Sequence, residues 1–297
     1  MRFLFVDKIL STDESRVIRG VKHVTADDYY LTFDEDRQIV FMPSLIGETL
    51  GQLAAWHVMK ELDFKLRPVA GVVSSATSHR SVPIGSTLQL ESVIESCDES
   101  AVQYHSVATV GNDVVFSIEG ALGPMQPMSD FIDRDVVIQQ YAEIAPKGDD
   151  HPDNDLVSAK DTCYDFLNPT VTPIAFQYDH VVAFQPNESI QAIKKITVSA
   201  PYFADHFPLK PVLPLTVLLE SNINLARTFL AHSQFMKSYR FEKMNKIKMS
   251  AFVQPGEVVN THLTVKSCDN ESMILAIRSD VAGKRVCVLE MILTARG

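Results

Sequence analysis

The sequence predicts an α+β fold built from two copies of one unit, in which a curved antiparallel sheet wraps around one long helix. Two observations lead to this prediction. The chain carries a weak internal repeat at an offset of about 172 residues. Each copy also contains one apolar segment of helical length, followed by stretches in which apolar and polar residues alternate. A helix that is apolar nearly all round must be buried on most sides, so each sheet is expected to curve around its helix.

The repeat is visible at four places that follow the same order in both halves. The matching segments are 5–15 with 177–189, 21–30 with 194–203, 41–56 with 212–227, and 78–93 with 246–265. Within them, Asp7 corresponds to Asp179, and Glu48 corresponds to Glu220. Four weak matches in one order are improbable by chance, so we interpret the chain as a tandem duplication.

Three parts of the chain follow from this interpretation. They are an N-terminal repeat over 1–127, an inter-repeat linker over 128–172 and a C-terminal repeat over 173–297. The second half of the linker is rich in Asp, Pro, Gly and Asn, a composition that buries little and favours a surface segment. Its first half, 131–144, is long enough for a short amphipathic helix.

The long helices are expected over 45–62 and 214–236. Pro43 and Pro214 stand at their entries, where a missing backbone N–H costs nothing. The alternating segments that predict half-buried strands are 88–96, 102–110 and 113–122 in the first copy, and 258–267, 273–281 and 285–295 in the second. The first residues, MRFLFVDKIL, do not have the form of a signal peptide and predict a strand that starts at residue 1.

Composition bounds the class of protein. The 297 residues, 46% hydrophobic and 22% charged, suit one large or two medium globular domains, and no apolar run is long enough to span a bilayer. The net charge of -10 disfavours sequence-independent binding to nucleic acid. The nine histidines show no ligand spacing, and neither do the four scattered cysteines, Cys97, Cys163, Cys268 and Cys287. We therefore expect no metal or cofactor, reduced cysteines and a cytoplasmic location.

Residues 205–220, DHFPLKPVLPLTVLLE, place a histidine in a loop stiffened by prolines and a glutamate on the apolar face of the next helix. This segment resembles the hotdog-fold β-hydroxyacyl-thioester dehydratases of fatty-acid synthesis, the FabZ- and FabA-like enzymes. Their pattern is H-F-P-x-x-P-x-x-P-G-x-x-x-x-E-x-x-x-Q. The residues that match it are His206, Phe207, Pro208, Pro211, Pro214 and Glu220. With the repeat, the resemblance implies a double hotdog fold.

The two copies depart from the family pattern in different ways. The glycine after the third proline corresponds to Leu215 in the second copy and to Ser44 in the first, and the glutamine corresponds to Asn224. The first copy has no loop histidine, because FDEDRQIVFMP replaces the H-F-P segment, yet it keeps Glu48 followed by Gln52. Each half has therefore lost a different part of the motif.

In this family, each active site takes its histidine from one hotdog unit and its acid from the other. The resemblance therefore implies a single active site, in which His206 pairs with Glu48. The supporting residues would be Gln52, Leu215, Pro214 and Phe207. The reciprocal site would contain Glu220 and Asn224 without a histidine, and we expect it to be vestigial.

Each part of this site suits one step of a dehydration. An imidazole titrates near neutrality and can take the C2 proton, which is the role expected for His206. A carboxyl group that faces an apolar tunnel keeps its proton and can protonate the leaving 3-hydroxyl, which is the role expected for Glu48. A backbone N–H at a helix N-terminus could hold the thioester oxygen, although Leu215 could shield that amide.

A basic segment over 237–248 stands out in an otherwise acidic chain. Its cations are Lys237, Arg240, Lys243, Lys246 and Lys248. In the family, basic residues near this strand receive the acidic acyl carrier protein or a phosphate of the pantetheine arm, because local positive charge steers an acidic partner. The alternative is an exposed edge strand kept soluble by lysines. We weigh the two interpretations equally.

The implied activity is that of a cofactor-free dehydratase, a lyase that converts 3-hydroxyacyl thioesters of acyl carrier protein or coenzyme A into trans-2-enoyl thioesters. Fatty-acid, lipid and polyketide pathways all stay open. A hotdog thioesterase is one alternative, and a non-catalytic acyl-binding or scaffold protein is another, which the lost histidine and glycine favour. A homo-oligomer of the fused pseudo-dimer is also open.

Overall fold

The computed structural model describes residues 2–12, 16–146 and 172–296. Its first half contains β1 (Lys8–Thr12), β2 (Val17–His23), β3 (Leu31–Phe33), β4 (Ile39–Phe41), α1 (Pro43–Glu61), β5 (Leu66–Pro68), β6 (Val72–Ser78), β7 (Thr87–Cys97), β8 (Ala101–Val110) and β9 (Asp113–Pro127). The short 3₁₀ helix η1 (Met128–Asp130) and helix α2 (Arg134–Ile144) follow. The second half contains β10 (His180–Gln185), β11 (Ser189–Lys195), η2 (Pro201–Ala204), α3 (Leu215–Ala231), β12 (Tyr239–Met249), β13 (Val258–Cys268), β14 (Ser272–Val281) and β15 (Lys284–Ala295).

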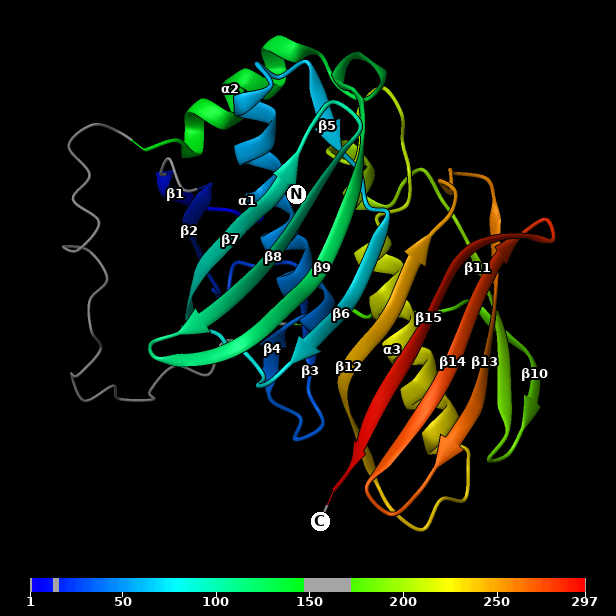
Figure 1. Cartoon of the computed structure of the whole chain (residues 1–297). Helices are drawn as coiled ribbons and strands as arrows, with labels where there is room; N and C mark the ends of the chain where they lie inside the picture. Colours follow the sequence, from blue (N-terminus) through cyan, green and yellow to red (C-terminus); the bar gives the residue numbers. More distant parts are fainter. Residues whose placement is uncertain (1, 13–15, 147–171, 297) are drawn as a thin grey trace.

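The strands of both halves join in one antiparallel sheet, which has thirteen strands within the described ranges (Figure 1). The order along the sheet is β1-β2-β7-β8-β9-β6-β12-β15-β14-β13-β11-β10, with β5 paired to β9. The sequence predicts two sheets side by side, whereas β6 and β12 pair across the junction, with Lys243 opposite Thr77 and Lys248 opposite Val72. A free strand edge presents unpaired N–H and C=O groups, and here the two inner edges satisfy one another.

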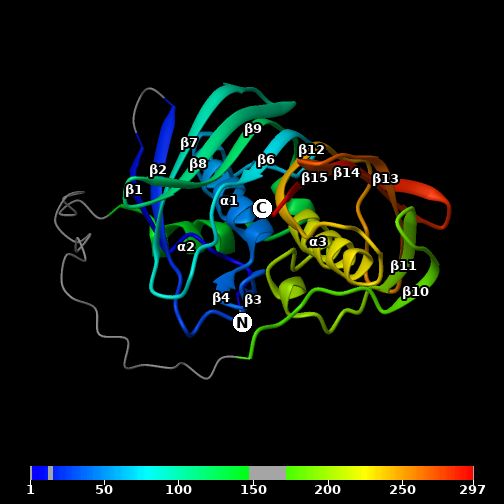
Figure 2. The same ribbon diagram turned by 90° about the horizontal axis from the view of Figure 1, so that it is seen from below.

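Both long helices lie under the concave face of this sheet, α1 beneath the first half and α3 beneath the second (Figure 2). Each begins at a proline, since Pro43 is the first residue of α1 and Pro214 directly precedes α3. Helix α3 ends at Ala231, before the expected 236, because His232 and the polar residues after it offer no further buried face.

Helix α2 occupies the first half of the linker, where the sequence predicts a short helix. Its N-cap is Asp133, whose carboxylate accepts a hydrogen bond from the backbone N–H of Asp135 at 2.8 Å. The second half of the linker, 147–171, and Cys163 within it lie outside the described residues. The cysteines inside the described ranges, Cys97, Cys268 and Cys287, are free thiols.

One main hydrophobic core extends through both halves. It includes Leu50 and Leu53 of α1, and Leu218 and Phe229 of α3, each with no exposed surface. Burying one such side chain stabilises the fold by about 1.5–3 kcal/mol. The halves therefore pack as one body through α1 and α3. No helix in the described part of the chain combines the length and apolar character that crossing a membrane requires.

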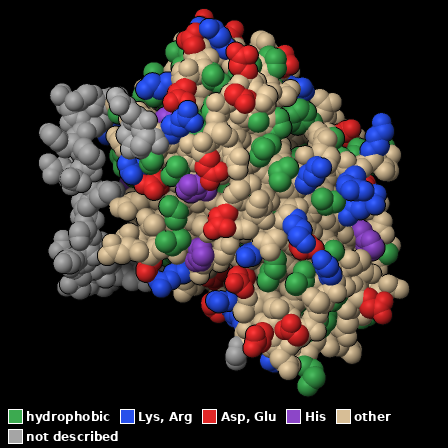
Figure 3. Space-filling model, viewed as in Figure 1, with side chains coloured by type: hydrophobic (Ala, Val, Ile, Leu, Met, Phe, Trp, Pro, Cys, Tyr) green, Lys and Arg blue, Asp and Glu red, His purple; other side chains and the backbone are tan. Residues whose placement is uncertain are grey.

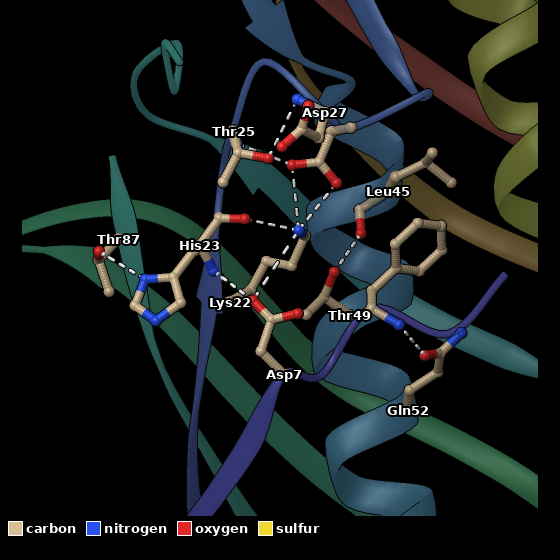
Figure 4. Close-up of polar contacts among 11 residues, drawn as sticks. Asp7, Lys22, His23, Thr25, Asp27, Leu45, Thr49, Gln52 and Thr87 are labelled. Carbon is tan, nitrogen blue, oxygen red and sulfur yellow. Dashed lines mark hydrogen bonds and ion pairs between the residues drawn. The ribbon is translucent and has the colours of Figure 1, made fainter. Parts of the chain in front are cut away.

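Local hydrogen bonds recur at the offset of the sequence repeat. The carboxylate of Asp7 accepts from the backbone N–H of His23 at 2.6 Å, and that of Asp179 accepts from the backbone N–H of Lys195 at 2.5 Å. Figure 4 shows the first of these, beside the Lys22 amine, which donates to the His23 carbonyl at 2.6 Å. The two aspartates matched in sequence thus make the same contact in each half.

The first strand begins at Lys8, so the expectation of a strand from residue 1 is wrong. The preceding residues are fixed by side chains instead of by a neighbouring strand. The Gln52 side chain accepts from the N–H of Phe5 at 2.9 Å and donates to the carbonyl of Phe3 at 3.0 Å. The N–H of Phe3 donates to the Asp205 carboxylate at 2.6 Å. These side chains satisfy the backbone groups that a strand would otherwise pair.

Candidate active site

A cavity of about 200 Å³ lies between α1, α3 and the inner face of the sheet near its junction. Its lining is mostly apolar, from α1, α3, α2, β9 and β12. The polar side chains that face it include Glu48, Gln52, Arg67, Asp205, His206 and Thr216. His206 comes from the second half and Glu48 from the first, so the structure brings the two expected groups to one cavity. A concave, mostly apolar cavity with a few converging polar groups is typical of a small-molecule site.

His206 is held by the loop that precedes α3. Its Nδ1 lies 2.9 Å from the carbonyl oxygen of Val212, and its backbone N–H donates to the carbonyl of Tyr202. A carbonyl can only accept, so Nδ1 carries the hydrogen and Nε2 keeps a free lone pair. Burial lowers the pKa of His206 to about 3, and the charge of Arg67 lowers it further by a smaller amount. The hydrogen bond to Val212 acts in the opposite direction and raises the pKa. The imidazole is therefore a neutral base.

Glu48 is anchored by both halves of the chain. Its Oε2 accepts from the Thr216 hydroxyl of α3 at 2.7 Å, and its Oε1 accepts from the Gln52 amide one turn along α1 at 3.0 Å. Burial raises the pKa of Glu48, and the hydrogen bonds from Thr216 and Gln52 and the charge of Arg67 only partly oppose it. Desolvation of a carboxyl group favours its proton-bound form, so Glu48 can act as an acid beside a neutral imidazole.

Glu220 occupies the equivalent position on α3 but does not line the cavity that holds His206. It is completely buried, and its Oε2 accepts from the Ser44 hydroxyl at 2.8 Å and from the Ser44 N–H at 3.3 Å. Its Oε1 has no hydrogen-bond partner among the described residues. The Asn224 amide donates to the carbonyl of Phe176 at 3.0 Å, as Gln52 does to an N-terminal carbonyl in the other half.

A hairpin occupies the place of the histidine loop in the first half. Strands β3 and β4 pair there, and the Asp34 carboxylate closes their turn by accepting from the N–H groups of Asp36 at 3.0 Å and Gln38 at 2.9 Å. The segment FDEDRQIVF thus forms a compact turn that holds no imidazole. Glu220 is enclosed without a base.

The helix contacts correct one equivalence drawn from sequence. Ser44 corresponds to Thr216 and not to Leu215, because each hydroxyl donates to the carboxylate of the other half. Leu215 is the first residue of α3 and lines the cavity, Pro214 is the N-cap of that helix, and Phe207 stacks on the His206 ring with centroids 3.9 Å apart. Counting four residues back from each glutamate aligns Ser44 with Thr216, so an alignment of the repeats on the glutamates would identify Thr216 as a site residue.

Arg67 is a site residue that no sequence motif indicates. It lies on β5, lines the cavity and places its guanidinium carbon 3.8 Å from the centroid of the Phe207 ring. Burial lowers the pKa of Arg67 to about 10, and the charge of Glu48 opposes this. The group still carries its charge near neutral pH.

The basic segment lies on a central strand, so the edge-strand interpretation is wrong. Strand β12 is paired on one side with β6 and on the other with β15. Its buried residues Met244 and Ile247 line the cavity, while Arg240, Lys246 and Lys248 are exposed on the outer face. Figure 3 shows Lys and Arg side chains on this face, over the strands of the second half.

Two of the five cations in this segment are already engaged within the chain. Lys237 donates to the carbonyl of Asn270 at 2.6 Å, and Lys246 forms an ion pair with Glu290 at 3.1 Å. The remaining three form no ion pair with any described residue: Arg240, Lys243 and Lys248. They are the cations of this strand that a partner could contact.

The sequence is similar to those of known dehydratases. The family model of the ApeI-like dehydratases matches residues 183–288. The 3-hydroxyacyl-[acyl-carrier-protein] dehydratase FabZ of Rickettsia bellii (strain OSU 85-389) is 37% identical over 90 residues, which cover 29% of this chain and 62% of that protein. FabZ of Shewanella woodyi (strain ATCC 51908 / MS32) is 30% identical over 125 residues, which cover 40% of this chain and 80% of that protein.

Among solved structures, the dehydratase domain of PpsC from Mycobacterium tuberculosis in complex with C12:1-CoA resembles the whole fold. The TM-score is 0.55 at 13% sequence identity, and the likeness covers 98% of both chains. The curved sheet around its helices thus defines an α+β protein of the hotdog type, as the sequence predicts. The fold and the sequence matches agree, and the chain belongs to the hotdog dehydratases that include the FabZ 3-hydroxyacyl-[acyl-carrier-protein] dehydratases.

Proposed function

We propose that the protein is a dehydratase that converts 3-hydroxyacyl thioesters into trans-2-enoyl thioesters at one active site per chain. The site belongs to a double hotdog made of repeats 1–127 and 173–297 around the linker 128–172. One observation carries the proposal. A neutral imidazole, His206, and a carboxyl group with a raised pKa, Glu48, reach one apolar cavity from opposite halves.

The proposed reaction uses these two groups in turn. Nε2 of His206 takes the proton from C2, and the electrons of the C–H bond form an enolate whose charge lies on the thioester oxygen. Glu48 gives its proton to the 3-hydroxyl, the C3–O bond breaks, water leaves, and the enolate electrons form the C2–C3 double bond. The imidazolium proton then returns to the Glu48 carboxylate, which restores both groups.

We propose that the thioester arrives on an acidic acyl carrier protein that docks over the outer face of β12. Lys248 lies opposite Val72 in the β6–β12 pair, and Val72 both lines the cavity and is exposed. With Arg240 and Lys243, Lys248 gives this part of the surface positive charge near the cavity. Local charge of this kind accelerates the encounter with an acidic partner.

Product analysis tests the proposed function. The wild-type protein is incubated with 3-hydroxyacyl thioesters of several chain lengths on acyl carrier protein and on coenzyme A. An enoyl thioester is expected. A free acid would show a thioesterase, and bound but unchanged substrate on every carrier would show an acyl-binding protein.

The pH dependence follows from the two shifted pKa values. The active form has a neutral His206 and a protonated Glu48. Lowering the pH inactivates the protein when His206 gains a proton, near its pKa of about 3. Raising the pH inactivates it when Glu48 loses its proton, above the raised pKa of that carboxyl group. We expect no acid limb in kcat/KM near pH 6.5, where a solvated histidine titrates. Thr216→Val removes a hydrogen bond that lowers the Glu48 pKa, so the alkaline limb should move to higher pH. A wild-type acid limb near pH 6.5 would contradict this assignment.

Gly51 should determine how long an acyl chain the cavity accepts. It lines the cavity one turn of α1 beyond Glu48, and a Cβ there would lie 3.4 Å from the Tyr104 hydroxyl. Valine would fill the space between α1 and Tyr104 and block a chain that runs along the helix. We expect Gly51→Val to lower kcat/KM for long substrates far more than for short ones, with Gly51→Ala intermediate. An unchanged chain-length profile would show that the acyl chain runs elsewhere.

A further inference from the structure

Arg67 is the one cation that lines the cavity among the described residues, and no protein acceptor engages it there. Its Nε is buried without a hydrogen-bond partner, and its guanidinium forms no ion pair with Glu48, whose oxygens already accept from Thr216 and Gln52. A buried charge is costly unless it is paired. This guanidinium therefore points to an acceptor atom that a ligand brings into the cavity.

The position of Arg67 is fixed relative to the base. Its guanidinium carbon lies 3.8 Å from the centroid of the Phe207 ring, and the His206 ring stacks on the same ring with centroids 3.9 Å apart. The imidazole and the guanidinium are both too close to the Phe207 ring centroid to lie on the same face of that ring. His206 and Arg67 therefore lie on opposite faces of Phe207. Stacking fixes the plane of the guanidinium and leaves its N–H groups free to donate.

The proposed reaction supplies a matching acceptor, because negative charge develops on the thioester oxygen when the C2 proton leaves. The donor expected from sequence is the backbone N–H at the start of α3, which belongs to Leu215, and the leucine side chain lines the cavity beside it. We propose that Arg67 donates to the thioester oxygen of the substrate and stabilises the enolate. This inference rests on the proposed function and adds a third catalytic residue to it.

The kinetic test compares Arg67→Met with a matched cation. Lys210 packs its amine over Phe131 and Phe252, at 4.9 and 5.0 Å from their centroids, but does not line the cavity. Loss of one oxyanion donor typically costs about 100- to 1000-fold in kcat. We expect a loss of that size in Arg67→Met with a smaller change in KM, partial activity in Arg67→Lys, and rates close to wild type in Lys210→Met.

Two readouts separate this role from a structural one. Guanidinium ion added to Arg67→Ala should restore part of kcat, because it can occupy the vacated space beside Phe207. A residue that only anchors Phe207 would instead lower Tm and show no rescue. If Arg67→Met retains kcat within tenfold of wild type, or if guanidinium gives no rescue of a folded Arg67→Ala, the inference is overturned.

A binding measurement tests the inference even if the protein proves not to be a dehydratase. The ligands are dodecanoyl-CoA and S-dodecyl-CoA, in which two hydrogens replace the carbonyl oxygen. A hydrogen bond to a charged donor favours the first by roughly tenfold or more, so wild type and Lys210→Met should prefer dodecanoyl-CoA and Arg67→Met should not. No preference in wild type, or an equal preference in Arg67→Met, would overturn the inference. Absence of an enoyl product would overturn the proposed function alone.

Discussion

Replacing His206 by alanine should abolish the formation of enoyl thioester. His206 is the one imidazole among the described residues that line the cavity, and because its Nδ1 donates to Val212, its Nε2 keeps the lone pair that the proposed base requires. Loss of a general base costs typically about 100- to 10,000-fold. The measurement is the rate of enoyl product at saturating substrate, together with Tm to show that the variant is folded.

Two variants control for packing. His206→Asn keeps a side-chain N–H that can donate to the Val212 carbonyl but supplies no base, so it should be as inactive as alanine and more stable. His232→Ala is a matched replacement, because the Nδ1 of His232 also meets a backbone carbonyl, that of Thr228 at 3.0 Å, but on the surface. It should keep wild-type turnover. If His206→Asn turns over at more than a tenth of the wild-type rate, the base lies elsewhere.

Glu48→Gln should inactivate the protein, whereas Glu220→Gln should not. The two glutamates occupy the same position in α1 and α3 and bind equivalent hydroxyls, Thr216 and Ser44, but Glu48 alone faces the cavity that holds His206. Glutamine keeps the acceptor for the Thr216 hydroxyl and cannot protonate the leaving hydroxyl. We expect a loss of about 100- to 10,000-fold in kcat for Glu48→Gln.

The glutamate pair is its own control, because one substitution is made at two sites related by the repeat. Glu220→Gln should change the free energy of unfolding by about 1 kcal/mol, since the Ser44 hydroxyl still finds an acceptor. Its kcat/KM should equal that of wild type. Equal losses of turnover in both variants would show either two working sites or a requirement for both carboxyl groups in the fold.

Much of the fold could be read from the chain because it depends on local patterns. The prolines at the starts of α1 and α3 and the alternation in the strands are short-range signals, and the match of Asp7 with Asp179 is visible as a repeat within the single sequence. The histidine loop was readable for the same reason, since the spacing from His206 to the helix lies within one motif. The roles of the site residues stay predictions until the variants are measured.

Other features depend on contacts between distant segments. The single sheet arises because β6 and β12 meet, which no periodicity within either strand encodes. Counting from the prolines aligns Ser44 with Leu215, because the first copy is one residue shorter between its proline and its glutamate. The hydrogen bonds that the two hydroxyls exchange reveal the true register. Arg67 acquires its place by stacking on Phe207, from the other half of the chain.

The fusion of both halves in one chain has a consequence for how the protein behaves at low concentration. Two separate subunits that each lend part of a site come apart when they are diluted, and the site disappears with them. Here a covalent tether keeps the partners at a high effective concentration whatever the number of molecules in solution. His206 and Glu48 are thus expected to meet within each single molecule, independent of expression level.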